Sequence, residues 1–168
     1  MTTATPITVF AANCRGNPTN CLYPHRIEIT DVATAAEAFS RDIVCAEYRN
    51  NYRGVENFLI SNTLPMDCDN DHSNDPALWI TAEDIETFFP DVTYLIHYSR
   101  HHMKPKGNLS SRPRFHAVFL IDPTIDPGAY VRLKQRVAEI FPFSTAAQFW
   151  AGSSQPSQGL RMDPPAMA

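Results

Sequence analysis

Three acidic residues at alternate positions are the part of this sequence best suited to chemistry. Asp67, Asp69 and Asp71 follow an apolar lead-in at 58–66 that predicts a β-strand. Side chains alternate along a strand, so the three carboxylates would share one face. Their mutual repulsion disfavours ionisation unless a positive charge lies among them. Mg²⁺ typically takes one or two carboxylates together with substrate phosphates, so the pattern indicates either a metal site or a solvated acidic turn.

A basic segment follows the acids and favours the metal interpretation. Residues 99–113 predict a long polar loop, and 114–121 predict the clearest strand of the chain, with His116 on the same face as Val118 and Leu120. A histidine in such a strand is more often a core residue. Here, however, hydrogen-bond donors suited to phosphate oxygens surround it. These donors are Ser110, Ser111, Arg112 and Arg114, and the preceding loop adds Arg100, His101, His102, Lys104 and Lys106 to a dense basic cluster. An acidic strand beside such a segment is what metal-assisted phosphoryl or nucleotidyl transfer requires.

Length and composition indicate one soluble globular domain. The chain has 168 residues, of which 43% are hydrophobic and 19% charged. No apolar run approaches the roughly 18 residues of a membrane helix, and no signal peptide is evident, so we expect an intracellular protein with no membrane partner. The net charge of −4 argues against broad non-specific DNA affinity but allows a local basic patch. Four cysteines form no C-x-x-C pair, and we expect free thiols in a reducing compartment.

The predicted elements mix strands and helices, so the expected class is α+β or α/β around a central sheet. Asp31 or Thr30 caps a helix whose apolar positions continue to Ala46. The other expected elements are a strand at 26–29, a turn at 52–54, a helix at 82–89, a strand at 93–98 and a helix at 127–140. The tail beyond Gly152 resembles a linker, which gives a domain at 1–152 and a flexible segment at 153–168.

An ordered series of motifs resembles the archaeo-eukaryotic primase-polymerase superfamily, in the branch found on phages, plasmids and mobile elements. The resemblance covers about Tyr48 to Gly152. It rests on the following segments: Tyr52-Arg53 with Asn57-Phe58; Met66-Asp67-Cys68-Asp69-Asn70-Asp71-His72-Ser73; Trp79; Ser99-Arg100-His101-His102-Met103-Lys104; Arg112-Pro113-Arg114-Phe115-His116; and Tyr130 with Leu133-Lys134.

The resemblance implies a fold, a reaction and a set of site residues. The fold would be a mostly antiparallel sheet like the RNA-recognition fold, flanked by helices. Asp67 and Asp69 would hold Mg²⁺ or Mn²⁺, and Ser110 and His116 would match the family's Ser…His element at the nucleotide phosphates. Arg112 and Arg114 would assist there, while Arg100, His102 and Lys104 would line the same pocket. The N-terminal part would hold template DNA, with Arg49, Tyr52 and Arg53 as its contacts.

The sequence departs from the family at the third metal ligand. The family has an acidic residue after the motif that here reads Phe141-Pro142-Phe143, whereas residues 144–152 contain no acid. Asp122, Asp126 or Glu139 could substitute in space. Two functions therefore remain open. One is a DNA primase or polymerase domain that joins nucleoside triphosphates on a template, alone or with a helicase. The other is a degenerate module that binds nucleotide or DNA without synthesis.

Overall fold

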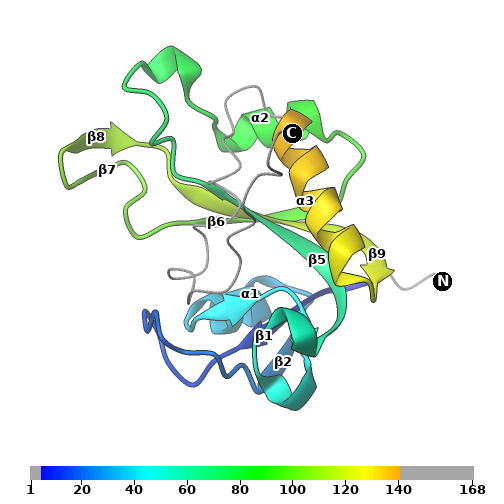
Figure 1. Cartoon of the computed structure of the whole chain (residues 1–168). Helices are drawn as coiled ribbons and strands as arrows, with labels where there is room; N and C mark the ends of the chain where they lie inside the picture. The colour runs from blue at the N-terminus through cyan, green and yellow to red at the C-terminus, as the bar shows by residue number, and fades with distance from the viewer. Residues whose placement is uncertain (1–4, 141–168) are drawn as a thin grey trace, which may run out of the picture.

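A computed structural model describes residues 5–140 as an α+β structure built on antiparallel sheets (Figure 1). The strands are β1 (Ile7–Ala11), β2 (His25–Ile29), β3 (Ile43–Val44), β4 (Glu47–Tyr48), β5 (Phe58–Cys68), β6 (Tyr94–Tyr98), β7 (Lys104–Lys106), β8 (Leu109–Arg112) and β9 (Phe115–Thr124). The helices are α1 (Val32–Phe39), α2 (Ala82–Phe88) and α3 (Pro127–Ile140), with 3₁₀ turns η1 (Arg49–Asn51), η2 (Val55–Asn57) and η3 (Pro76–Leu78). The predicted tail, and the segment expected to hold the third acid, lie outside the described residues. No helix in residues 5–140 is long and apolar enough to cross a membrane.

The central sheet has the strand order β4-β5-β9-β6, and each neighbouring pair is antiparallel. Helices α2 and α3 cover one face of this sheet (Figure 1). There, Phe115 and Phe119 of β9 pack with Ile85 of α2 and Tyr130 of α3 in the largest apolar core. The alternation expected for β9 is therefore confirmed on this face.

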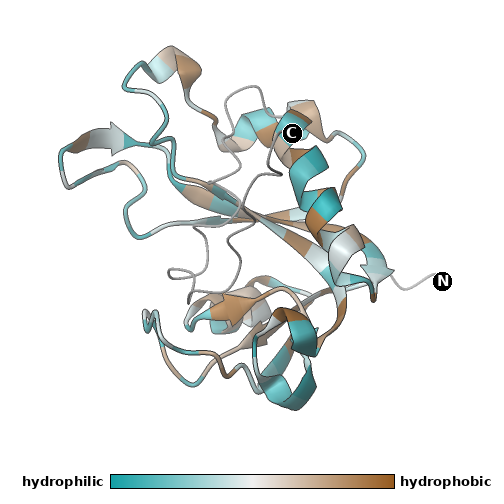
Figure 2. Ribbon diagram, viewed as in Figure 1, coloured by the Kyte–Doolittle hydropathy of each residue, from teal (hydrophilic) through white to brown (hydrophobic). Residues whose placement is uncertain are grey.

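The N-terminal layer, which consists of β1, β2, β3 and α1, covers the opposite face. Its three strands pair in the order β2-β1-β3. Val118 of β9 packs into its core beside Val9 and Ala38. Figure 2 shows hydrophobic segments both along β5 and β9 and in this lower layer. Hence β9 contributes side chains to two separate cores.

Polar side chains of β5 fasten the N-terminal layer to the central sheet. The Thr63 hydroxyl donates to the carbonyl oxygens of Thr8 and Cys45, at 3.0 Å each, and the Ser61 hydroxyl also donates to Cys45. Thr8, Cys45, Ser61 and Thr63, which form these bonds, are all buried. Such bonds satisfy carbonyl groups that would otherwise be buried without partners.

Two predicted elements were wrong in extent. The first helix begins at its Asp31 cap, whose carboxylate accepts from the Thr34 amide at 2.8 Å, but it ends at Phe39 rather than near Asn50. Ile43 and Val44 instead pair with β1, because this pairing buries β-branched side chains in the N-terminal layer. The segment 99–113 is not one long loop, since β7 and β8 form a hairpin turned by Gly107 at φ +58°.

The helices expected at 82–89 and 127–140 and the strands expected at 26–29 and 93–98 are confirmed within one residue. The turn expected at 52–54 is wrong, because Tyr52 and Gly54 are extended and the turns η1 and η2 lie on either side of them. The strand that leads into the acids is β5, and the strand containing His116 is β9. Helix α2 begins with the expected reciprocal cap between Thr81 and Asp84. All four cysteines are free thiols.

Candidate functional site

The register of the central sheet places three polar residues in one row. Asp67 of β5 lies opposite His116 of β9, and His116 lies opposite His97 of β6. The rings of His97 and His116 stack with their centres 5.7 Å apart, and Phe39 of α1 stacks on His97 at 4.2 Å. The row therefore runs from the end of β5 to the N-terminal layer.

Asp67 is buried without adequate partners among the described residues. Its side chain is 7% exposed, and its Oδ1 atom lies 3.4 Å from Nδ1 of His116. The alignment is too poor for a hydrogen bond, so Oδ1 has no hydrogen-bond partner in residues 5–140. Burial raises the pKa of Asp67 to about 7, assisted by Asp69 and opposed by Lys106. A buried carboxylate oxygen without a hydrogen-bond partner is a candidate ligand for a cation.

Burial favours the neutral form of both histidines. Burial, together with the neighbouring His116 and Arg15, lowers the pKa of His97 to about 4. Burial also lowers the pKa of His116, although Asp69 acts in the opposite direction. The contact between His116 and Asp67 is therefore not a permanent ion pair. A neutral imidazole can still donate one hydrogen bond to an anionic ligand.

A left-handed bend at Asn70 positions the other two acids. Asn70 has φ +56°, and its fully buried amide bonds the backbone of Ile80 and the carbonyl of Pro113. The strand thus ends at Cys68, and Asp71 lies in the following turn instead of on the strand face. Asp69 stays next to Asp67 and pairs with Lys106, whose Nζ lies 2.8 Å from Oδ2 of Asp69.

Arg112 and Arg114 have structural contacts in place of the expected free guanidinium groups. Both side chains are 0% exposed. Arg112 donates to the carbonyl oxygens of Asn70 and Ser73, and Arg114 donates to that of Lys104 at 2.9 Å. Arg114 also pairs with Asp71 at 3.2 Å. These bonds hold the acidic bend against the start of β9. Both arginines therefore affect the site indirectly, by fixing the backbone around it.

A cavity of about 400 Å³ joins the row of polar residues to both layers of the protein. Its described wall contains six basic side chains and three carboxylates. The basic residues are Arg15, Arg41, Arg53, Arg100, Lys106 and Lys134, and the acids are Asp42, Asp67 and Asp69. Because six basic side chains face three carboxylates, this wall carries an excess of positive charge even with the flanking histidines neutral. An anionic ligand with its own cation fits such a wall.

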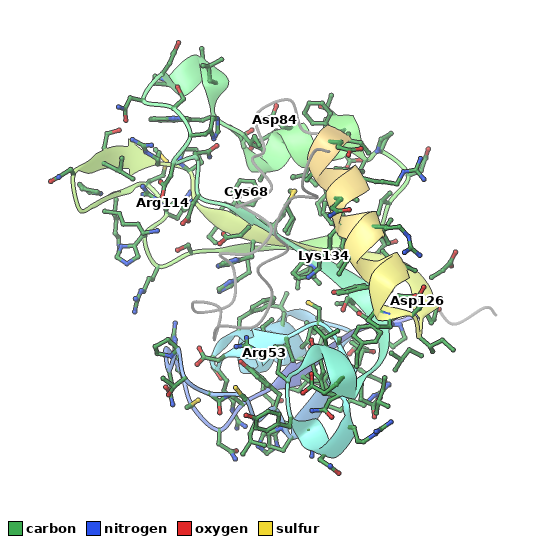
Figure 3. All side chains as sticks on the ribbon, viewed as in Figure 1. Arg53, Cys68, Asp84, Arg114, Asp126 and Lys134 are labelled. Atoms are coloured by element: carbon green, nitrogen blue, oxygen red, sulfur yellow. The ribbon has the colours of Figure 1, made fainter. Side chains whose placement is uncertain are left out.

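Lys134 enters the cavity from α3. Strand β4 pairs with β5 only near Phe58 and Ile60, so residues 65–67 of β5 have no partner strand on that edge within residues 5–140. These residues line the cavity together with Lys134. The Lys134 ammonium lies 4.7 Å from the centre of the Tyr130 ring, and burial lowers its pKa. No described carboxylate forms an ion pair with it. Figure 3 shows Lys134 on the side of α3 next to the sheet and Arg53 in the layer below.

The structure brings together only part of the predicted site. Asp67, Asp69, His116, Arg100 and Arg53 line the cavity. The remaining predicted residues lie outside its described wall: Arg49, Tyr52, His102, Lys104, Ser110, Arg112 and Arg114. Ser110 contacts Arg112 at 3.1 Å and does not accompany His116. The His102 ring packs against Tyr98, and its Nδ1 atom lies 3.2 Å from both the N–H and the carbonyl of Arg114.

Sequence reasoning missed four basic residues and one histidine of this wall. Arg15 and Arg41 lie in or next to loops, where no local pattern indicates a shared cavity. His97 could have been found, because the alternation of 93–98 places it beside His116 in an antiparallel pair. Lys134 follows Tyr130 at helical spacing, which is a usable signal for contact. Lys106 was noted only as one charge in the basic segment.

None of the three substitutes for the missing acid lines the described wall. Asp122 and Glu139 are exposed. Asp126 pairs with Arg132 at 3.4 Å at the start of α3, and Figure 3 shows it at the opposite end of the sheet from Arg114. Within residues 5–140, no group of three His, Cys, Asp or Glu side chains could hold a metal. The described protein can therefore supply two carboxylates, Asp67 and Asp69, which suits a cation that takes its other oxygens from water and ligand.

Comparison with known proteins assigns no family to the chain. No protein-family model matches the chain, and neither the curated proteins nor the solved structures include a match. The conclusions about function consequently depend on the geometry of this molecule.

Proposed function

We propose that the chain is a nucleotidyltransferase domain of the archaeo-eukaryotic primase type, which extends DNA from nucleoside triphosphates. The observation that carries the proposal is the pair of Asp67 and His116 on adjacent strands, next to Asp69, in a cavity with excess positive charge. It supports the finer fold assignment as well, because the motif series that resembles the family contains both the acidic pair and the histidine.

In this proposal Asp67 and Asp69 hold Mg²⁺ or Mn²⁺, which would neutralise charge on the transferred phosphate and favour ionisation of the attacking hydroxyl. The 3′-oxygen bonds to the α-phosphorus, the bond to pyrophosphate breaks, and the hydroxyl proton passes to water. His116 donates to a phosphate oxygen in its neutral form. Arg100 and Lys134 hold the remaining phosphate charge, while Arg15, Arg41 and Arg53 face the DNA backbone.

A second function is favoured by one observation: within residues 5–140, no third acid joins Asp67 and Asp69 in a group that could hold a metal. With two carboxylates, the cation that arrives with the triphosphate keeps its phosphate ligands, whereas a cation at the 3′-hydroxyl has fewer protein ligands. Nucleotide binding could then survive without synthesis. Mn²⁺ would support more activity than Mg²⁺, because Mg²⁺ demands a near-ideal octahedron.

Primer extension separates the two functions. A primed DNA template, deoxynucleoside triphosphates and Mn²⁺ are incubated with the full chain and with the Asp67→Asn/Asp69→Asn variant. Extension by the full chain and its loss in the variant support the enzyme. Binding of a fluorescent triphosphate without extension supports the binding module. Absence of metal-dependent nucleotide binding contradicts both.

A further inference from the structure

Lys106 is the cation nearest to the acidic pair, and its ion-pair partners among residues 5–140 are carboxylates. Its Nζ atom lies 2.8 Å from Oδ2 of Asp69 and 3.8 Å from Oδ2 of Asp71. Arg114, by contrast, is also bound to backbone carbonyl oxygens and is completely buried. The Lys106 side chain is 43% exposed and lines the cavity. It is therefore the cation of this cluster that can leave its place at the least cost.

Lys106 brings to the acidic pair the positive charge that a metal ion would bring, but it does not complete the hydrogen bonds of the two carboxylates. Its ammonium lies 2.8 Å from Oδ2 of Asp69 and offsets the negative charge of the acidic pair, as a divalent cation would. Yet Oδ1 of Asp67 remains without a hydrogen bond, so the lysine does not satisfy the pair. A cation between Asp67 and Asp69 would repel the ammonium and compete with it for Asp69.

We propose that Lys106 is a built-in counter-ion of the acidic pair, displaced by a divalent cation and then available to the phosphates of the incoming nucleotide. The first half depends on metal binding alone, whereas the second rests on the proposed function. The hairpin allows the movement, because Lys106 is next to the exposed turn at Gly107 and needs only side-chain rotation to point further into the cavity. A lysine is suited to this exchange, since its flexible stem carries a point charge without fixed hydrogen-bond geometry.

The test compares Lys106→Met with Lys104→Met, an exposed neighbour on the same strand that lies outside the cavity wall. Mn²⁺ binding is measured by electron paramagnetic resonance at one fixed pH for all variants. We expect Lys106→Met to bind free Mn²⁺ about tenfold more tightly, because the competing charge is gone. Lys104→Met and the charge-conserving Lys106→Arg should retain the affinity of the unmodified chain. Unchanged or weaker Mn²⁺ binding in Lys106→Met overturns the proposal.

A second measurement tests the nucleotide half. In saturating Mn²⁺, Lys106→Met should bind a nucleoside triphosphate about tenfold more weakly, with little change for the nucleoside itself. Equal loss in Lys104→Met would contradict a specific role. Circular dichroism and thermal melting confirm folding, and Lys106→Gln provides a second neutral variant. If Mn²⁺ binding tightens but the unmodified chain shows no triphosphate binding, the counter-ion stands and the proposed function fails.

Discussion

Asp67 is costly to the fold because no described partner compensates for its burial. Removing a carboxylate from water disfavours its charged form, and the nearby Asp69 adds repulsion. Residues that cost stability and carry perturbed pKa values are concentrated at functional sites. The burial of Asp67 is therefore better explained by a role in the candidate site than by a contribution to folding stability.

This cost predicts a pH-dependent stability. The pKa of folded Asp67 is raised to about 7, whereas an unfolded aspartate has roughly 3.9, so the folded state binds the proton more tightly. The contribution of Asp67 to the free energy of unfolding is therefore greatest below about pH 4 and is lost as the pH rises towards 7. Asp67→Asn should remove this loss and raise stability at pH 8 by on the order of 2–4 kcal/mol.

Urea unfolding at pH 5 and pH 8 measures the effect, with the exposed Asp91→Asn as the matched control. Mn²⁺ should stabilise the unmodified chain at pH 8 and have less effect on Asp67→Asn. Equal pH dependence of stability in the unmodified chain and in Asp67→Asn would show that Asp67 is better solvated than its burial implies.

Lys134 gives a second prediction at the scale of single residues. Its ammonium is buried without a described acid, so Lys134→Met should leave the free energy of unfolding unchanged or raise it by about 1 kcal/mol. The same variant should bind nucleoside triphosphate about tenfold more weakly, since a charged hydrogen bond is lost. Urea unfolding measures the stability and isothermal titration measures the affinity. Arg136→Met, from the exposed face of α3, is the control in each experiment. A stability loss without a change in affinity would make Lys134 a packing residue.

At the scale of elements, the acidic bend depends on two arginines that arise from β8 and the start of β9. Arg112 bonds the carbonyl oxygens of Asn70 and Ser73 and stacks over Trp79 at 5.3 Å. It thus fastens the segment after β5 to the hairpin. The sequence showed two arginines near a histidine, but whether they contact ligand or backbone depends on the path of residues 70–74.

Arg112→Met should therefore destabilise the protein by about 3–5 kcal/mol, because several buried carbonyl groups lose their donor. Ser110→Ala, which removes a neighbouring exposed hydroxyl, should cost less than about 1 kcal/mol. Chemical denaturation gives both values. If Arg112→Met instead keeps its stability and loses nucleotide affinity, the arginine is a phosphate ligand after all.

Much of the sheet could be predicted from the sequence, because local signals and tertiary packing agree there. The alternation around His116 matches its two-sided burial, and Thr81 with Asp84 marks the start of α2. The first helix was extended too far because Ile43 and Val44 fit a helical period as well as a strand. Their pairing with β1 is non-local, and no window of sequence contains it.

The candidate site was predictable for residues that share a strand pair and not for those that meet across layers. Asp67 and His116 could be placed from two strand patterns. Arg41 and Lys134 come from opposite sides of the sheet, so their common cavity depends on how the layers pack. The burial of Arg114 was equally hidden, since composition alone predicts an exposed arginine.

At the scale of the whole molecule, the ring stack of Phe39, His97 and His116 joins the N-terminal layer to the site. Phe39→Ala should admit water to His97 and raise its pKa from about 4 towards the ordinary value near 6.5. The stability cost should be about 1–3 kcal/mol, because Phe39 is only partly buried. Histidine titration by nuclear magnetic resonance gives the pKa directly, with Val32→Ala as an exposed control on the same helix. An unchanged pKa would mean that other groups keep His97 dry.

The two-sided burial of β9 also limits how this gene can vary. Substitutions that keep apolar character on each face are tolerable, but a codon inserted or deleted just before His116 is not. A shift of one residue turns every following side chain to the other face. Ala117 and Phe119 would then face the N-terminal layer, and the histidine would be driven in among the residues under α2 and α3. Length variation among relatives should therefore fall in the β7–β8 turn and spare β9.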